Sequence, residues 1–338
     1  MDFAFSSEQQ AIRDAVSAIC RHFDDAYWLK RDHEGGFPHE FHAAFAAEGW
    51  LGICIPEAYG GSGLGVAEAA IMMRTIAESG AGMSGASAVH INVFGLNPVV
   101  VVGTDEQKRR MLPGMIDGRE KACFAVTEPN TGLNTTQLKT RAVRKGDRYV
   151  VDGTKVWIST AQVADKILLL ARTTPLEEVG RATEGLSLFY TDLDRSRIKV
   201  HEIEKMGRKA VDSNELFIES FEVPLADRLG EEGKGFEYIL HGMNPERILI
   251  AADACCAALR ISPPSTRPLK SISRAASTAR PPTGTISAAS AACAISSPAP
   301  TRLRAAAPSS RCPQPRAADE AASSPMSPPS ASTLAPPT

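Results

Sequence analysis

The stretch Cys123-Phe-Ala-Val-Thr-Glu-Pro-Asn-Thr-Gly-Leu-Asn134 is followed, about one β-hairpin later, by Val156-Trp-Ile-Ser159. Each segment places a small hydroxyl residue, Thr127 or Ser159, at the end of an apolar strand, and Trp157 stands two residues before the second hydroxyl. Two such strand ends can supply backbone N–H groups, hydroxyls and an aromatic wall to a flat, polar-edged ring. The two segments therefore predict a site for a heteroaromatic ring on a β-domain.

The residues before this stretch predict helices. Ser6 to Gln10 is typical of a helix cap with an acidic first turn. Apolar residues then repeat at helical spacing, at Ile12, Ala15, Val16, Ile19 and Phe23. Further helical patterns cover residues 41–48, 66–79, 86–102 and 106–116. Residues 1–120 are therefore predicted to form an all-α domain.

The hydrophobic period changes to that of strands from Ala122 onward. Residues 139–160 alternate between apolar and polar, with Asp152-Gly153 as the predicted tight hairpin turn. Short strands are predicted at residues 166–172, 186–191, 198–203 and 213–223. Residues 121–229 are accordingly assigned to a middle β-domain, built as a compact barrel or sandwich.

The C-terminal part divides at about residue 260. Glycine-rich residues 230–236 end the β-domain, and a helix is predicted to about Leu259, so residues 230–259 start a second helical domain. In residues 260–338, 64 of 79 residues are Ala, Ser, Pro, Thr or Arg, which predicts a disordered tail. The predicted fold class is α+β: an N-terminal all-α domain, a middle β-barrel or sandwich, a truncated C-terminal helical domain and the tail.

Charge and cysteine content narrow the function classes. The tail carries nine Lys/Arg and two Asp/Glu, so the chain's net charge of −2 leaves −9 for residues 1–259. An acidic body without a basic stripe argues against nucleic-acid binding. The seven cysteines form no CxxC pair and no zinc spacing, so no metal site is predicted. We also expect no membrane span and a cytoplasmic location, because neither a secretory leader nor an apolar stretch of about 20 residues is visible.

Both motif segments, their order and their spacing resemble the acyl-CoA dehydrogenase family over residues 1–259. The resemblance implies the family's order of an α-domain, a β-domain and a helical bundle. It also implies FAD as cofactor and α,β-dehydrogenation of an acyl-CoA thioester. Because the tail stands in place of most of the bundle, we interpret residues 260–338 as the product of a frameshift near residues 258–262.

The resemblance assigns the flavin contacts residue by residue. Phe124, Ala125, Val126 and Thr127 line one edge of the ring, and Trp157, Ile158 and Ser159 cover its other side. The family usually has Gly-Ser/Thr-Asp after the Glu-Pro pair, whereas this chain has Gly132-Leu133-Asn134. Leu133 therefore replaces a hydroxyl expected beside substrate or cofactor phosphates. An ordinary strand pair with a core tryptophan is the alternative interpretation.

The base that removes the α-proton is assigned in the same way. A subset of the family carries it on the first helix after the β-domain, before an arginine, and this chain has Met243-Asn-Pro-Glu-Arg-Ile248 there. Glu246 is the candidate catalytic base, with Asn244, Arg247 and Leu133 as candidate substrate contacts. The alternative is that Glu246 and Arg247 form a solvated pair in the first turn of a helix started by Pro245.

The resemblance further implies an acyl-CoA substrate, an electron-transfer flavoprotein as electron acceptor, and a homo-oligomer, which the family builds through the bundle that the tail replaces here. It places His90, Asn92, Leu96 and Pro98 at the wall of the acyl pocket, with core packing as an equal alternative. Two other functions remain open: a non-catalytic remnant with weak or no flavin and acyl-CoA binding, and an acyl-CoA oxidase.

Overall fold

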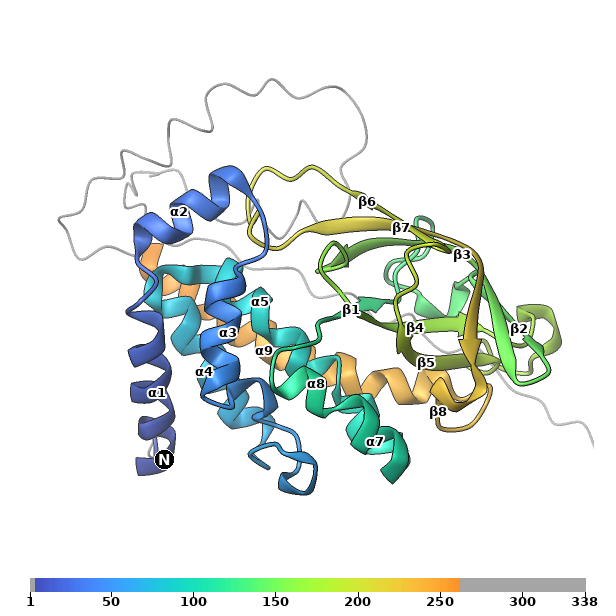
Figure 1. The fold of residues 1–338 in the computed structure, drawn as a ribbon, viewed down its shortest axis with the longest axis horizontal. Coiled ribbons are helices and arrows are strands. Elements are labelled where there is room, and N and C mark those ends of the chain that lie inside the picture. Colours follow the sequence, from blue (N-terminus) through green and yellow to red (C-terminus); the bar gives the residue numbers. More distant parts are fainter. Residues whose placement is uncertain (1–3, 262–338) are drawn as a thin grey trace, which may run out of the picture. The chain divides into compact units, whose positions relative to one another are not determined.

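The computed structural model describes residues 4–261, with side chains described up to residue 254. A run of helices comes first, strands follow, and one long helix returns to the first group (Figure 1). The α-helices of the first group are α1 (Ser7–Cys20), α2 (Asp25–Glu34), α3 (His39–Ala47), α4 (Val66–Ile76), α5 (Gly82–Phe94), α6 (Asn97–Val102), α7 (Asp105–Met111) and α8 (Pro113–Ile116). The predicted α-then-β order is confirmed. The tail prediction falls almost entirely outside the described residues.

Helix α1 shows why these residues form a helix. The Ser6 hydroxyl accepts from the backbone N–H of Gln9, and the Gln9 side chain accepts from the backbone N–H of Ser6, so a capping box starts the helix. Ile12, Val16 and Cys20 then recur every four residues and are buried. Helix α2 was not predicted, because its only buried residue is Trp28 and it has no apolar repeat.

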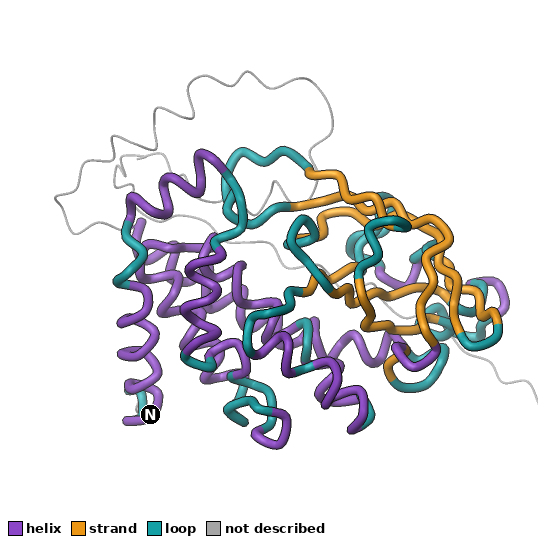
Figure 2. Tube along the Cα trace, in the orientation of Figure 1, coloured by secondary structure: helices purple, strands orange, loops and turns teal. Residues whose placement is uncertain are grey.

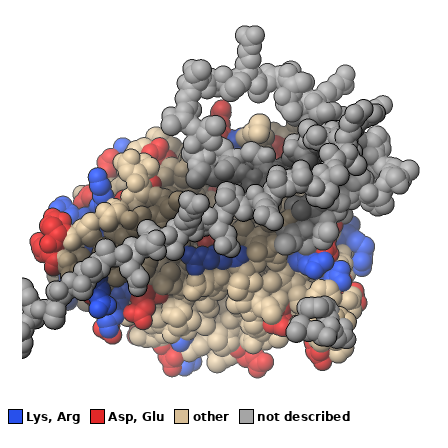
Figure 3. Space-filling view, turned by 180° about the vertical axis from the view of Figure 1, so that it is seen from behind, with Lys and Arg blue, Asp and Glu red and all other residues tan. Residues whose placement is uncertain are grey.

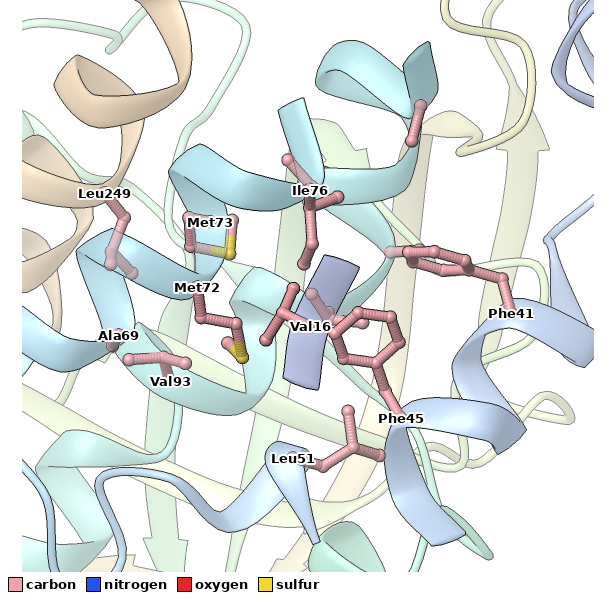
Figure 4. Packing of buried hydrophobic residues seen from close by; sticks show 14 of the residues in the cluster. Val16, Phe41, Phe45, Leu51, Ala69, Met72, Met73, Ile76, Val93 and Leu249 are labelled. Carbon is pink, nitrogen blue, oxygen red and sulfur yellow. The ribbon is translucent and has the colours of Figure 1, made fainter. Parts of the chain in front are cut away.

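The first helices and the last share one hydrophobic core (Figure 4). Val16 of α1, Phe41 and Phe45 of α3, Met72 of α4 and Leu249 of the long C-terminal helix are buried in it. One helical run among the described residues, Val66–Val102, is long and apolar enough to cross a membrane, and 78% of its most apolar window is buried inside the fold. That burial is typical of a core helix.

The strands within residues 4–261 form one eight-stranded mixed sheet, gathered beside the helices in Figure 2. They are β1 (Ala122–Ala125), β2 (Arg141–Lys145), β3 (Arg148–Ser159), β4 (Lys166–Arg172), β5 (Leu186–Asp192), β6 (Ile198–Glu202), β7 (Ser213–Pro224) and β8 (Arg228–Leu229). Their order is β6-β7-β3-β2-β4-β5-β8, and β1 pairs with β4 in parallel. The predicted β-domain is therefore present, as a single sheet.

The predicted hairpin turn at Asp152-Gly153 is wrong. Strand β3 runs through both residues, and the β2–β3 turn lies at Gly146-Asp147, where Gly146 has a φ of 65°. Asp152 and Gly153 instead stand at a register shift between β3 and β7. The pair is common at both turns and bulges, because both need a residue that tolerates unusual backbone angles.

Helix α9 (Gly235–Ile261) connects the two groups of elements, since it contacts β5 as well as α4, α5 and α6 (Figure 1). Two glycines allow this close approach. A Cβ on Gly235 would lie 2.6 Å from the backbone of Ser187 and Leu188 on β5, and one on Gly242 would lie 2.8 Å from the carbonyl oxygen of Phe94 on α5. The helix is therefore fitted tightly against both layers.

Side chains of both charge signs lie intermixed around the described part of the face shown in Figure 3, beside a broad area of uncharged residues. Some exposed charges of the protein are paired, for example Arg148 with Asp147 and Glu222. Such exposed pairs contribute about 0–1 kcal/mol each to stability. The fold therefore depends on its cores rather than on this surface.

Candidate active site

The two motif segments lie side by side. Strand β1 ends at Ala125, and its parallel pairing with β4 carries Val126 and Thr127 to the edge of the sheet. The backbone N–H of Val156 on β3 donates to the carbonyl oxygen of Thr127 at 3.0 Å. Residues almost thirty positions apart in the sequence thus form one continuous wall.

Trp157 stands out from this wall because the backbone bulges beneath it. The pairing of β3 with β7 shifts register between Lys155 and Ile158, and Trp157 has a φ of 62°, in the left-handed region. That conformation costs a bulky aromatic residue about 1–3 kcal/mol, so contacts with the surrounding structure must stabilise it. The bulge leaves the indole 47% exposed at the rim of a cavity rather than in the core.

A buried polar cluster supports the backbone just after Trp157. The Asn214 side chain on β7 donates to the carbonyl oxygen of Ile158 at 2.8 Å and also bonds to Asp212. The exposed Gln162 covers these two residues: its backbone N–H donates to Asp212 at 3.2 Å and its side chain to Asn214 at 2.8 Å. The sequence did not predict the role of these residues, because no local pattern shows that β7 pairs with β3.

A second buried group lies just before Trp157. Lys155 and Glu128 are 0% and 7% exposed, and their Nζ and Oε1 atoms are 3.0 Å apart. Burial lowers the pKa of Lys155 to about 8, whereas for Glu128 the opposing effect of burial is outweighed by Lys155 and by hydrogen bonds, which lower its pKa. Both groups are therefore charged at neutral pH.

A cavity of about 180 Å³ opens in front of the wall. The sheet side contributes the motif residues and their neighbours, namely Phe124, Val126, Thr127, Gly132, Thr135, Trp157, Ile158, Ser159 and Thr160. The helical side contributes His90, Ile91 and Phe94 from α5 and Met243 and Glu246 from α9. The volume of the cavity is below the roughly 300–1,000 Å³ typical of small-molecule clefts and cavities.

Glu246 lies in the interior of α9 and not in a first turn, because the helix begins eleven positions earlier at Gly235. Pro245 has no N–H to donate within the helix. The carbonyl oxygen of His241, four residues before Pro245, would otherwise lack a donor. The Asn97 side chain on α6 donates to it at 2.7 Å and so replaces the missing N–H. The first-turn alternative for Glu246 and Arg247 is therefore wrong.

The Glu246 carboxylate is partly buried, and its pKa is shifted. Burial raises its pKa, and the neighbouring Arg247 opposes this only in part. Among the described side chains, those of residues 4–254, none forms a hydrogen bond or ion pair with the Glu246 carboxylate. A partly buried carboxylate with a raised pKa and free oxygens can accept a proton from a bound molecule.

Four predicted site residues lie outside the cavity lining. Ala125 is fully buried in the sheet core, and Leu133 is 98% exposed on the loop beside Gly132. Asn244 and Arg247 are exposed on α9, where the arginine side chain donates to Asn244. Their predicted contacts with cofactor or substrate stay predictions.

Of the four candidates for the acyl-pocket wall on the N-terminal helices, one lines the cavity and three do not. His90 lines the cavity, where burial lowers its pKa to about 4, and its Nδ1 donates to the carbonyl oxygen of Ser87 at 3.0 Å. Asn92 instead donates to the carbonyl oxygen of Met115, and Leu96 and Pro98 pack in the interior. A neutral imidazole beside Phe94, 4.8 Å between ring centroids, thus joins the apolar wall of the cavity.

Two family models match the chain: "Acyl-CoA dehydrogenase, N-terminal domain" over residues 6–119 and "Acyl-CoA dehydrogenase, middle domain" over residues 123–221. Together they cover more than half of it. The chain belongs to the acyl-CoA dehydrogenase family. This membership confirms the resemblance drawn from the two motif segments, which both fall in the middle-domain match.

Individual members of the acyl-CoA dehydrogenase family show how far the similarity extends. An acyl-CoA dehydrogenase of Bacillus subtilis is 33% identical over 219 residues, covering 64% of this chain and 56% of the relative. The mitochondrial isovaleryl-CoA dehydrogenase of Pongo abelii is 30% identical over 249 residues, covering 73% and 58%. A solved acyl-CoA dehydrogenase of Geobacillus kaustophilus has a TM-score of 0.72 at 28% identity, covering 77% and 68%. The chain thus spans less than two thirds of these curated relatives.

Acyl-CoA dehydrogenases depend on FAD, and the cavity wall of this chain fits the ring of that cofactor. The half-exposed Trp157 indole offers a flat apolar surface, and the Thr127 and Ser159 hydroxyls beside it can bond to a polar ring edge. Trp157 has a strained backbone, yet its half-exposed side chain gains little from packing in the core. Strain of this kind is typical of a binding surface.

Proposed function

We propose that this chain binds FAD against the wall formed by Thr127, Trp157 and Ser159, and oxidises an acyl-CoA thioester between Cα and Cβ. Phe124, Ala125, Val126 and Ile158 are proposed to complete the flavin contacts. The observation that carries the proposal is that Glu246, with its raised pKa, lines the same cavity as these wall residues.

The chemistry divides between Glu246 and the cofactor. An α-proton next to a thioester is weakly acidic, so its removal needs a desolvated carboxylate of raised pKa. Glu246 meets this requirement, because burial raises its pKa and its oxygens have no partner within the described part of the chain. FAD, when bound, supplies the acceptor for the hydride that leaves Cβ. His90, Phe94 and Met243 keep water from the reacting carbons.

The polar end of the substrate is proposed to lie along the outer side of α9 and the loop at Leu133. Asn244 and Arg247 lie on α9 beside Glu246, and both are exposed enough to meet a CoA group. Arg247 would pair with phosphate, and Asn244 already orients it by accepting one of its N–H groups. Leu133 offers only an apolar contact.

The test is Glu246→Gln in purified protein loaded with FAD. We expect acyl-CoA to bleach the flavin absorbance of the unmodified protein, and the variant to bleach at least about 10²-fold more slowly, because an amide cannot take the proton. FAD should stay bound in both. Glu237→Gln, which changes an exposed carboxylate on the same helix, is the matched control and should bleach normally. Unchanged bleaching in Glu246→Gln would exclude this residue as the base.

The same preparation separates the alternative functions. Protein that is colourless after addition of FAD supports a non-catalytic remnant. Release of hydrogen peroxide in air after bleaching supports an acyl-CoA oxidase. Reoxidation by an added electron-transfer flavoprotein supports the dehydrogenase and its proposed partner. The homo-oligomer and the cytoplasmic location are further proposals, open to gel filtration and to imaging of the tagged chain.

A further inference from the structure

The buried pair of Lys155 and Glu128 lies beneath the cavity wall without facing the cavity. The Lys155 ammonium donates to the carbonyl oxygens of Val126 at 3.0 Å and Leu170 at 2.8 Å, and to the Glu128 carboxylate at 3.0 Å. These three acceptors use all three of its protons. The Lys155 side chain of β3 therefore links the residue that follows β1, the middle of β4 and the first motif segment.

Glu128 extends the link in the other direction. Its carboxylate accepts the backbone N–H groups of Lys139 at 2.7 Å and Thr140 at 2.9 Å. Its own backbone forms a tight two-way bridge with Thr131, which closes the loop around the intervening Pro129 and Asn130. The pair is thus a junction of several backbone segments and not an isolated contact.

The position of this junction explains how Trp157 keeps its left-handed backbone. Lys155 is anchored two residues before Trp157, and the carbonyl of Ile158 is anchored by Asn214 one residue after it. Between them, the Val156 N–H is held by the Thr127 carbonyl. With both flanks fixed, relaxing Trp157 to an ordinary strand conformation would require breaking at least one of these buried bonds.

We propose that Lys155 and Glu128 are a positioning pair for the flavin wall: they set the spacing of the Thr127 and Trp157–Ser159 segments and hold the Trp157 indole at the cavity. The role of the wall in binding FAD rests on the proposed function above. A buried ion pair adds little stability over an apolar pair of the same size, so its value here lies in fixing a geometry.

The test removes both charges together in Lys155→Met/Glu128→Gln, which avoids leaving one buried charge without its partner. Two quantities are measured: hydrogen–deuterium exchange of the Val156 and Trp157 amides, and the dissociation constant for FAD. We expect exchange at these amides to become about tenfold faster or more, and FAD to bind about tenfold or more weakly, while the Leu169 amide in the β4 core keeps its protection.

Arg110→Met is the control, because it breaks an ion pair with the buried Asp227, which stands just before β8 and bonds to Thr191 on β5, and neither of these strands pairs with β3. It should lower stability without changing exchange at Val156 or the affinity for FAD. A folded double variant with unchanged Val156 exchange and FAD affinity would overturn the proposal.

Two further arms keep the result decisive. If the double variant does not fold, the unmodified protein still tests the proposal. Its Val156 amide should exchange as slowly as its Leu169 amide. A much faster exchange at Val156 would show that the segment opens locally, which contradicts a positioning role for the pair. If the unmodified protein binds no FAD, the proposed function fails, while the exchange data still decide whether the pair holds the segment.

Discussion

At the scale of single residues, α9 carries two buried carboxylates, Glu246 and Asp253, and burial raises the pKa of both. They stand seven positions apart, two helical turns, and so lie near the same face of the helix. Glu246 lines the cavity, and its raised pKa is the property that the proposed proton removal requires. Asp253 is 1% exposed, and its two oxygens have no hydrogen-bond partner among the described residues, so nothing in this part of the chain offsets the cost of burying its charge.

Asp253→Asn is therefore expected to stabilise the protein at alkaline pH. Folding raises the pKa of Asp253 from 3.8 to about 7, so the folded state binds this proton more tightly. The free energy of unfolding should then fall as the pH rises from about 4 to about 7 and stay low above that. Asn is neutral throughout, so the variant should gain roughly 1–4 kcal/mol at pH 8 and little at pH 4.5. Urea unfolding of both proteins at the two pH values measures the difference; an equal gain at both would contradict the mechanism.

At the scale of elements, strand β3 holds together most of the wall. It pairs with β2 and β7, carries Lys155 and Trp157, and bulges twice against β7. The sequence predicted the strand and its motif but not the bulges, because a bulge is a mismatch between two strands and only one of them is visible in a local pattern. Asp152-Gly153 was assigned to a turn for that reason.

Gly153→Ala should cost about 1–3 kcal/mol or more of stability. Its Cβ would lie 2.4 Å from the Thr140 hydroxyl and 2.7 Å from the Thr140 Cα, and backbone cannot move aside cheaply. Gly207→Ala is the matched control, because nothing lies within 4 Å of a Cβ there, and it should change stability by less than about 0.5 kcal/mol. Thermal unfolding compares the two. A tolerated Gly153→Ala would mean that β2 and β3 are packed less closely at this point.

At the scale of the whole described molecule, α9 makes the site by bringing Glu246 from the end of the described chain to the motif segments near its middle. The helix and its candidate base were predicted from the sequence. Its docking was not, since it depends on Gly235 and Gly242 meeting particular backbone atoms of β5 and α5. Asn97, which accommodates Pro245, is another tertiary contact without a local signal.

Leu249→Ala should destabilise the protein by about 2–5 kcal/mol, because Leu249 is fully buried in the core shared with the first helices (Figure 4). Ile248→Ala, at the neighbouring and half-exposed position, should cost less than about 1 kcal/mol. Denaturant unfolding of the two variants measures both. Equal effects would mean that α9 is not anchored through its inner face.

The sequence by itself predicted the change from helices to strands, because local periodicity is a property of neighbouring residues. Its short motifs gave the resemblance to the family, and through that resemblance the candidate residues Thr127, Trp157, Ser159 and Glu246. Only the tertiary structure decided that Trp157 is held in a strained conformation at a cavity, that Lys155 and Glu128 join the wall from beneath, and that Glu246 faces it. These features depend on contacts between residues far apart in the chain, and burial, strain and shifted pKa values exist only once those residues have met.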